Sequence, residues 1–242
     1  MCYPQNAIFQ VLFQNAVHLK LSYEISPMRW IEKQRASFLM NWYQINSAGL
    51  FISVCLLYFA AFMIKRMLII DEIAAFEILQ ERGEMWLFDL FFSLQYLVVP
   101  FFLAWKFTLT TFLLWVGCFM FGYRLTFAQL WKMVMIFELV FIIAEFLKVI
   151  WFTALASDPT YQEYVAFYPL SLINFVDFQS IGAQWLYPLK ALNLFELGYW
   201  ALLIVGIYWL SNKKLRIAAI IVCSSYILFF FVWLGFYLVV YK

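Results

Sequence analysis

The sequence predicts an all-α fold, a polytopic transmembrane helix bundle of five to six spans. Of its 242 residues, 67% are hydrophobic and only 12% are charged, and the mean hydropathy is +0.86. Soluble domains are roughly 45–50% apolar and about 25% charged. A chain of this size could not hide so much apolar surface from water, so a lipid bilayer is its expected partner.

Several function classes are disfavoured by what the sequence contains. The net charge of +2 is too small to indicate nucleic-acid binding, and one histidine with four scattered cysteines cannot supply a zinc cluster. The sequence has no P-loop, dinucleotide fingerprint, HExxH or GxSxG motif. We therefore predict no catalytic residue, no metal and no cofactor, and we expect a membrane-protein partner or a homo-oligomer.

Residues 1–66 form an N-terminal extension with one candidate span. The apolar stretch 48–64 ends at Lys65 and Arg66, whereas residues 1–44 are mixed and polar. A chain starting at Met67 would keep five spans and satisfy every charge cue, so two interpretations stand. Either 48–64 is a sixth span of the bundle, or residues 1–66 are a peripheral addition.

Residues 67–85 follow with an amphipathic pattern. Ile69, Ile73 and Phe76 share one helical face, and acidic residues occupy the other. This pattern predicts a helix that lies in the membrane interface rather than crossing the bilayer.

The remaining chain, 86–241, is predicted to contain five spans. One helix over 86–123 would measure about 57 Å, nearly twice the hydrocarbon thickness of about 30 Å. The sequence therefore predicts two spans there, 86–104 and 107–123, with Pro100 and Lys106 flanking the reversal.

Capping signals open two later spans. Thr126 and Gln129 form a capping box before the span 130–154, and Asn193 with Glu196 repeats this logic before 195–211. A polar, turn-rich segment over 155–192 separates these spans as an exterior loop. The basic turn 212–216 then leads into the last span, 217–241.

The distribution of Lys and Arg predicts the orientation. The turns 65–85, 124–132 and 212–216 hold eight basic residues, whereas the opposite connections and the C-terminus hold three. Since positive residues accumulate on the cytoplasmic side, the first set is predicted to be cytoplasmic and the 155–192 loop exterior.

The segment 135–152 carries an intramembrane charged face formed by Glu138, Glu145 and Lys148. Glu138 and Glu145 are two turns apart on one face, and Lys148 lies within reach of Glu145 as an i, i+3 pair. Each charge at mid-bilayer costs about 2.5–3.5 kcal/mol on insertion scales, so this face should turn into the bundle. It predicts either a proton or ion relay or a structural Glu145–Lys148 clasp. Gln95 and Asp89 are candidates for an adjoining polar groove.

Two stretches resemble the Yip family of Ypt/Rab-interacting membrane proteins. The run GYRLTFAQLWKMVMIFELVF (122–141) is similar to that family's glycine, threonine-phenylalanine and helix passage. The run LNLFELGYWALLIVGIYWLSNKKLRIAAII (192–221) is similar to its later aromatic, glycine and basic-turn segment. The family's acidic aromatic-Gly-Pro motif has no counterpart here. The resemblance covers about residues 86–241 and implies a five-span membrane scaffold or adaptor without a catalytic mechanism.

Three functional hypotheses follow from the sequence. The first is a non-catalytic scaffold, adaptor or assembly subunit. The second is a proton- or ion-coupled transporter, or a transporter subunit, that uses the charged face of the fourth span. The third, a membrane enzyme, would need clustered polar residues at one membrane face. The expected location is a bacterial inner membrane, with a eukaryotic endomembrane as the alternative.

Overall fold

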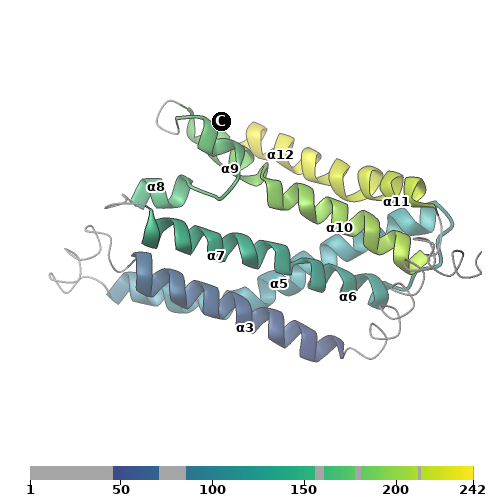
Figure 1. Cartoon of the computed structure of the whole chain (residues 1–242), viewed down its shortest axis with the longest axis horizontal. Helices are drawn as coiled ribbons and strands as arrows, with labels where there is room; N and C mark the ends of the chain where they lie inside the picture. Colours follow the sequence, from purple (N-terminus) through teal and green to yellow (C-terminus); the bar gives the residue numbers. More distant parts are fainter. Residues whose placement is uncertain (1–45, 71–85, 156–160, 178–180, 212–213, 242) are drawn as a thin grey trace, which may run out of the picture. The chain divides into compact units, whose positions relative to one another are not determined.

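Helices make up most of the chain that the structure describes (Figure 1). The structure is a computed structural model that describes residues 46–70, 86–155, 161–177, 181–211 and 214–241. These residues contain no named strand and a single isolated bridge, between Ser171 and Asn193. The predicted all-α class is confirmed. The predicted amphipathic helix 67–85 lies mostly outside the described residues.

The described elements follow one another in this order: α3 (Ser47–Lys65), the π-helical turn η1 (Arg66–Ile70), α5 (Trp86–Met120), α6 (Phe127–Phe137), α7 (Leu139–Ala154), α8 (Tyr161–Ala166), the 3₁₀ turn η2 (Leu172–Phe175), α9 (Ala183–Ala191), α10 (Leu194–Ser211), α11 (Leu215–Val222), the π-helical turn η3 (Cys223–Ile227) and α12 (Leu228–Val240).

The described residues include four helical stretches that are long and apolar enough to cross a membrane. They are Ser47–Leu68, Ser93–Met120, Leu194–Ser211 and Leu215–Val240. Their lengths of 18 to 28 residues match the roughly 20 residues that a hydrocarbon core requires. The chain is thus an integral membrane protein.

The predicted division of 86–123 into two spans is wrong. Trp86–Met120 is one helix of 35 residues with Pro100 inside it. Proline is tolerated in membrane helices because neighbouring groups satisfy the freed backbone. Lys106 marks no turn because its ammonium pairs with Glu138 inside the bundle.

The boundary expected at residue 66 also differs from the structure. Contacts divide the chain at Asn46, so α3 belongs to the compact unit that continues to Lys242. Within this unit α3 packs against α5, α6 and α7. Phe51, for example, contacts Phe107 of α5 and stacks on Trp131 of α6. The stretch 48–64 is therefore part of the bundle.

Of the two predicted helix caps, the first is confirmed and the second is confirmed in part. Thr126 and Gln129 form the reciprocal capping box at the start of α6. The Asn193 side chain accepts from the backbone N–H of Glu196 at 2.8 Å. The Glu196 carboxylate does not complete a box, since it accepts from Trp200 and Tyr226 instead.

Contacts along the helices fix their directions. Three α3 contacts with α6 and α7 (Phe51–Trp131, Tyr58–Glu138 and Lys65–Glu145) each join residues 80 positions apart. A constant offset means that α3 and α6–α7 run parallel. Because α3 crosses the membrane, α6 and α7 together form a fifth pass. Gly206 lies against Met133 and Phe137, while Tyr199 lies against Phe141, so α10 runs antiparallel to them.

This topology corrects the grouping of the connections. The end of α3 lies at the same end of the bundle as α8, because Lys65 binds Glu145 and Lys148 reaches Tyr164. We call this the α8 end (Figure 1). The turn 121–126, the end of α10 at Ser211 and the start of α11 at Leu215 lie at the other end, the α6 end. The prediction from the sequence placed 65–85 on the same side of the membrane as the turns 124–132 and 212–216. It did so because it divided α5 into two spans with a reversal between them.

We predict that the α6 end is cytoplasmic. Arg124, Lys132, Lys214 and Arg216 lie near it, whereas Lys65, Lys148 and Lys190 at the α8 end are bound to Glu145 or to backbone carbonyls. In a background lacking the native cysteines, Gln162→Cys in α8 should react with an impermeant maleimide on intact cells. Ala128→Cys at the start of α6 should react only after permeabilisation. The opposite labelling pattern would invert the orientation.

Gly206 provides a second prediction, because it permits the close approach of α10 to α6. A Cβ at Gly206 would lie 2.5 Å from the Met133 Sδ and 2.6 Å from the Phe137 ring, whereas one at Gly198 would meet nothing within 4 Å. Gly206→Ala should therefore destabilise the protein by about 1–3 kcal/mol. Gly198→Ala is the matched control and should not lower the melting temperature in detergent. Equal effects of the two substitutions would contradict this packing.

Candidate functional site

A buried carboxylate, Glu138, joins three passes near the middle of the bundle. Its Oε1 accepts from the Tyr58 hydroxyl of α3 at 2.8 Å and from the Lys106 Nζ of α5 at 2.6 Å. The Lys106 ammonium also lies 4.4 Å from the centre of the Phe141 ring in α7. We call Tyr58, Lys106 and Glu138 the central triad.

The central triad lies at the depth of the bilayer centre. Tyr58 is at the middle of the span Ser47–Leu68, and Lys106 is at the middle of Ser93–Met120. The Glu138 side chain is 0% exposed and that of Lys106 is 33% exposed. An unpaired charge at this depth would cost free energy. Glu138 and Lys106 are stable there because they form an ion pair with one another.

Glu138 also marks the junction between α6 and α7. Its backbone N–H donates to the Val134 carbonyl at 3.0 Å, as in an α-helix. Its own carbonyl accepts from Phe141 at 2.9 Å, three residues on, which tightens the turn locally. The α6–α7 pass therefore has a locally tighter turn at Glu138, the residue that carries its buried carboxylate.

Two polar atoms beside the central triad have no hydrogen-bond partner among the described residues. They are the second carboxylate oxygen of Glu138 and the Tyr199 hydroxyl of α10, both buried. The Tyr199 ring lies 5.2 Å from that of Phe141 and 5.6 Å from that of Tyr226. Glu196 follows on α10, where its Oε1 accepts from Trp200 at 2.8 Å and from Tyr226 at 3.0 Å. Polar groups therefore extend from the central triad toward α10.

A second ion pair lies two helical turns from Glu138, about 10 Å along the axis. Glu145 accepts from Lys65 at 2.6 Å, and these side chains are only 21% and 9% exposed. Lys65 also lies 4.3 Å from the centre of the Phe62 ring. This pair closes the α3–α7 contact at the α8 end.

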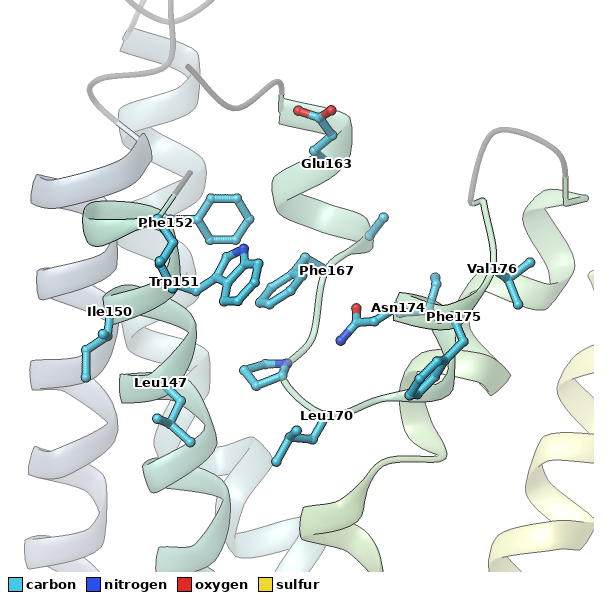
Figure 2. Close-up of a pocket in the computed structure, with 14 residues that line it drawn as sticks. Leu147, Ile150, Trp151, Phe152, Glu163, Phe167, Leu170, Asn174, Phe175 and Val176 are labelled. Atoms are coloured by element: carbon cyan, nitrogen blue, oxygen red, sulfur yellow. The ribbon is translucent and has the colours of Figure 1, made fainter. Parts of the chain in front are cut away.

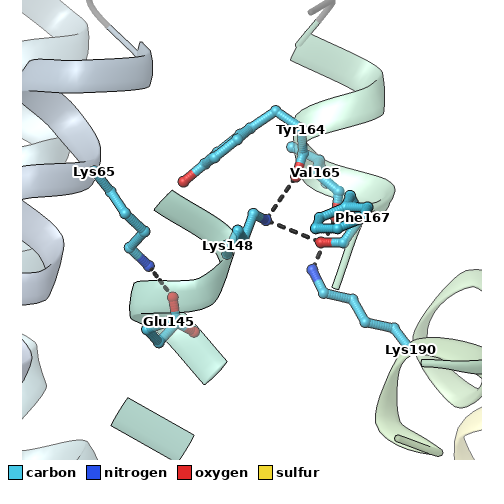
Figure 3. A network of polar contacts seen from close by, with 7 residues as sticks. All are labelled: Lys65, Glu145, Lys148, Tyr164, Val165, Phe167 and Lys190. Carbon is cyan, nitrogen blue, oxygen red and sulfur yellow. Dashed lines mark hydrogen bonds and ion pairs between the residues drawn. The ribbon is translucent and has the colours of Figure 1, made fainter. Parts of the chain in front are cut away.

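The predicted Glu145–Lys148 clasp is wrong. Lys148 donates to the backbone carbonyls of Tyr164 at 2.6 Å and Phe167 at 3.0 Å, as Figure 3 shows. Its ammonium also lies 4.1 Å from the centre of the Tyr164 ring. The i, i+3 spacing would allow a Glu145–Lys148 pair. Instead Lys148 binds backbone carbonyls at the end of α8, and Glu145 binds Lys65 of α3.

A second lysine binds the same short segment. Lys190 of α9 donates to the Val165 carbonyl at 2.8 Å. The last carbonyls of a helix have no intrahelical partner and carry its negative dipole end, so cations stabilise them. Burial lowers the pKa of Lys190 below its usual value. The two lysines thus fasten α8 to α7 and α9.

The other predicted site residues do not join this set. Gln95 is exposed on α5, so it lines no interior groove with the charged face. Asp89 lies within α5, but its side chain is outside the described residues. No three His, Cys, Asp or Glu residues are grouped for metal binding in the described part of the chain.

Sequence reasoning missed the partners of the charged face. They are Tyr58, Lys65 and Lys106. It also did not place Glu196 and Tyr199, which are buried on α10. The partner of Lys106 could have been expected from the sequence, because a lysine in the middle of a long apolar stretch needs an acidic partner on another helix. Tyr58 carried no such signal, because tyrosine is abundant in this chain.

Comparisons of the chain with models of protein families, with curated proteins and with solved structures find no match.

The central triad should behave as one structural unit. Glu138→Gln leaves Lys106 at the depth of the bilayer centre without its counter-ion, and breaking such a pair typically costs about 3–5 kcal/mol. Adding Lys106→Met removes the unpaired charge and should recover most of the loss. Melting temperatures in detergent for both singles and the double variant measure this coupling. Additive losses would show that the two groups act independently.

Two further double-mutant cycles identify the partner of Glu145. Glu145→Gln and Lys65→Met should be strongly non-additive, because they remove the two ends of one ion pair. Glu145→Gln and Lys148→Met should couple less, since Lys148 binds backbone carbonyls. The same melting measurements decide between them, and stronger coupling to Lys148 would restore the clasp.

Proposed function

We propose that the protein is a non-catalytic integral membrane scaffold, adaptor or assembly subunit of the kind that the Yip resemblance implies. The observation that carries the proposal is that the buried charged groups of the spans bind other elements of the same chain. Lys106 and Glu138 bind one another, Lys65 and Glu145 bind one another, and Lys148 binds the end of α8. Such groups hold α3, α5 and the α6–α7 pass in one arrangement and fasten α8 to it.

This proposal is supported by how each ion pair is placed. Both join helices that are far apart in the sequence, so each constrains a tertiary contact rather than a single helix. A scaffold needs this rigidity, because a fixed outer surface is what a partner recognises. We place the protein in a bacterial inner membrane, with a eukaryotic endomembrane as the alternative.

Purification of the full chain in a mild detergent from its native membrane tests the proposal. A scaffold should retain a membrane-protein partner at a fixed stoichiometry, or purify as a homo-oligomer. The Glu138→Gln, Lys106→Met double variant should retain the same assembly, because the pair acts only in folding. A monodisperse monomer without a partner would contradict the proposal.

Proton- or ion-coupled transport is the second candidate. It is favoured by the second oxygen of Glu138 and the hydroxyl of Tyr199, which are buried without a partner among the described residues. Such atoms can accept or pass a proton when water reaches them. Proteoliposomes loaded with a pH-sensitive dye should then show flux that Tyr199→Phe and the stable double variant both abolish. Absence of flux from the folded wild-type chain would exclude this candidate.

A further inference from the structure

An apolar hollow lies between α7 and the segment that follows α8. Its volume is about 860 Å³, within the range of small-molecule sites. Leu147, Ile150 and Trp151 of α7 line it together with Phe167 and Leu170, and Figure 2 shows Trp151 facing Phe167. Trp151 stacks on Phe167 with the ring centres 5.2 Å apart. The hollow thus has one wall on a membrane-crossing pass and one wall on the α8 end.

Hydrogen bonds hold the second wall in place. Leu170 adopts a positive φ of 54°, a conformation that is unfavourable for a leucine. Its carbonyl accepts from Leu194 and the N–H of Leu172 donates to Leu192, both at 3.0 Å. The Tyr168 carbonyl accepts from Ser171 at 2.7 Å and from Asn174 at 2.8 Å. The chain is thus fixed in a strained form that leaves Leu170, 57% exposed, on the hollow.

The hollow opens onto the lipid-facing side of α7. Ile143, Leu147 and Ile150 follow one another at helical spacing and are 56%, 39% and 56% exposed. Leu147 and Ile150 also line the hollow, so its wall continues the face that contacts lipid. A molecule on this wall would be in contact with the hydrocarbon of the bilayer.

The charges near the hollow favour an apolar occupant. No Lys or Arg is among its described lining residues, and Glu163 is the one acid. The nearby lysines, Lys148 and Lys190, donate instead to the carbonyls of Tyr164, Val165 and Phe167. Anionic groups gain nothing here, and binding must come from apolar contact.

We propose that this hollow is a lipid site that holds the acyl chain of a bilayer phospholipid. Apolar side chains line it on both walls, it opens toward the hydrocarbon, and its second wall is fixed before the chain enters. The lipid would fasten the α8 end to α7, beside the lysines that fasten α8 itself. This site does not depend on the scaffold function proposed above.

Photolabelling of the full chain tests the lipid site. The chain is reconstituted in phosphatidylcholine vesicles that contain a small fraction of phosphatidylcholine with a diazirine in its acyl chain. After illumination, adducts on residues 147–155 and 167–176 should be several-fold more frequent than adducts around Leu97 of α5. Leu97 is a fair reference because it is as exposed as Leu155 of the hollow, 66% for each. Equal labelling of the two regions would overturn the proposal.

Matched variants provide the control. Ile150→Trp fills the hollow, whereas Ile52→Trp adds the same ring to α3 at an equally exposed position, 56% against 57%. Native mass spectrometry should show several-fold loss of the one-phospholipid species for Ile150→Trp and none for Ile52→Trp. Melting temperatures confirm that both variants fold. Unchanged lipid retention in Ile150→Trp, or adducts that join two copies of the chain at the hollow, would overturn the proposal.

Discussion

The arrangement of the bundle depends on the contacts of the buried Glu138 carboxylate. This carboxylate accepts from Tyr58 of α3 and Lys106 of α5, so one buried group connects three passes. Near the bilayer centre neither ion could remain unpaired at low free energy. The helices must therefore approach in the one arrangement that brings these side chains together.

The offset of 80 residues extends that constraint along two passes. Phe51, Tyr58 and Lys65 meet Trp131, Glu138 and Glu145 at every second turn. A seven-residue repeat keeps one stripe of each helix facing its neighbour, as in coiled coils. Aromatic stacking, a neutral-to-charged hydrogen bond and an ion pair thus follow one another along a single seam. Gly206 sets the distance of α10 from the opposite side of α6.

The α8 end is organised by backbone groups rather than by carboxylates. Lys148 and Lys190 bind carbonyls of Tyr164, Val165 and Phe167, which a short helix leaves unsatisfied. The bridge between Ser171 and Asn193 ties the next segment to the start of α10. The described part of the connection between α7 and α10 is thereby packed against the bundle, and the lipid site proposed above lies against it.

The sequence by itself determined the membrane class, the helical fold and the local caps. Composition fixes the class because lipid is the one solvent that suits so much apolar surface, and the Thr126 capping box needs only four neighbouring residues. Tertiary structure decided the number of passes, since Pro100 and Lys106 act as breaks only when no neighbouring helix satisfies them. It also decided the partners of Glu138, Glu145 and Lys148. Those partners lie on other helices or beyond the next turn, and local spacing along α7 carries no information about which distant group is nearest.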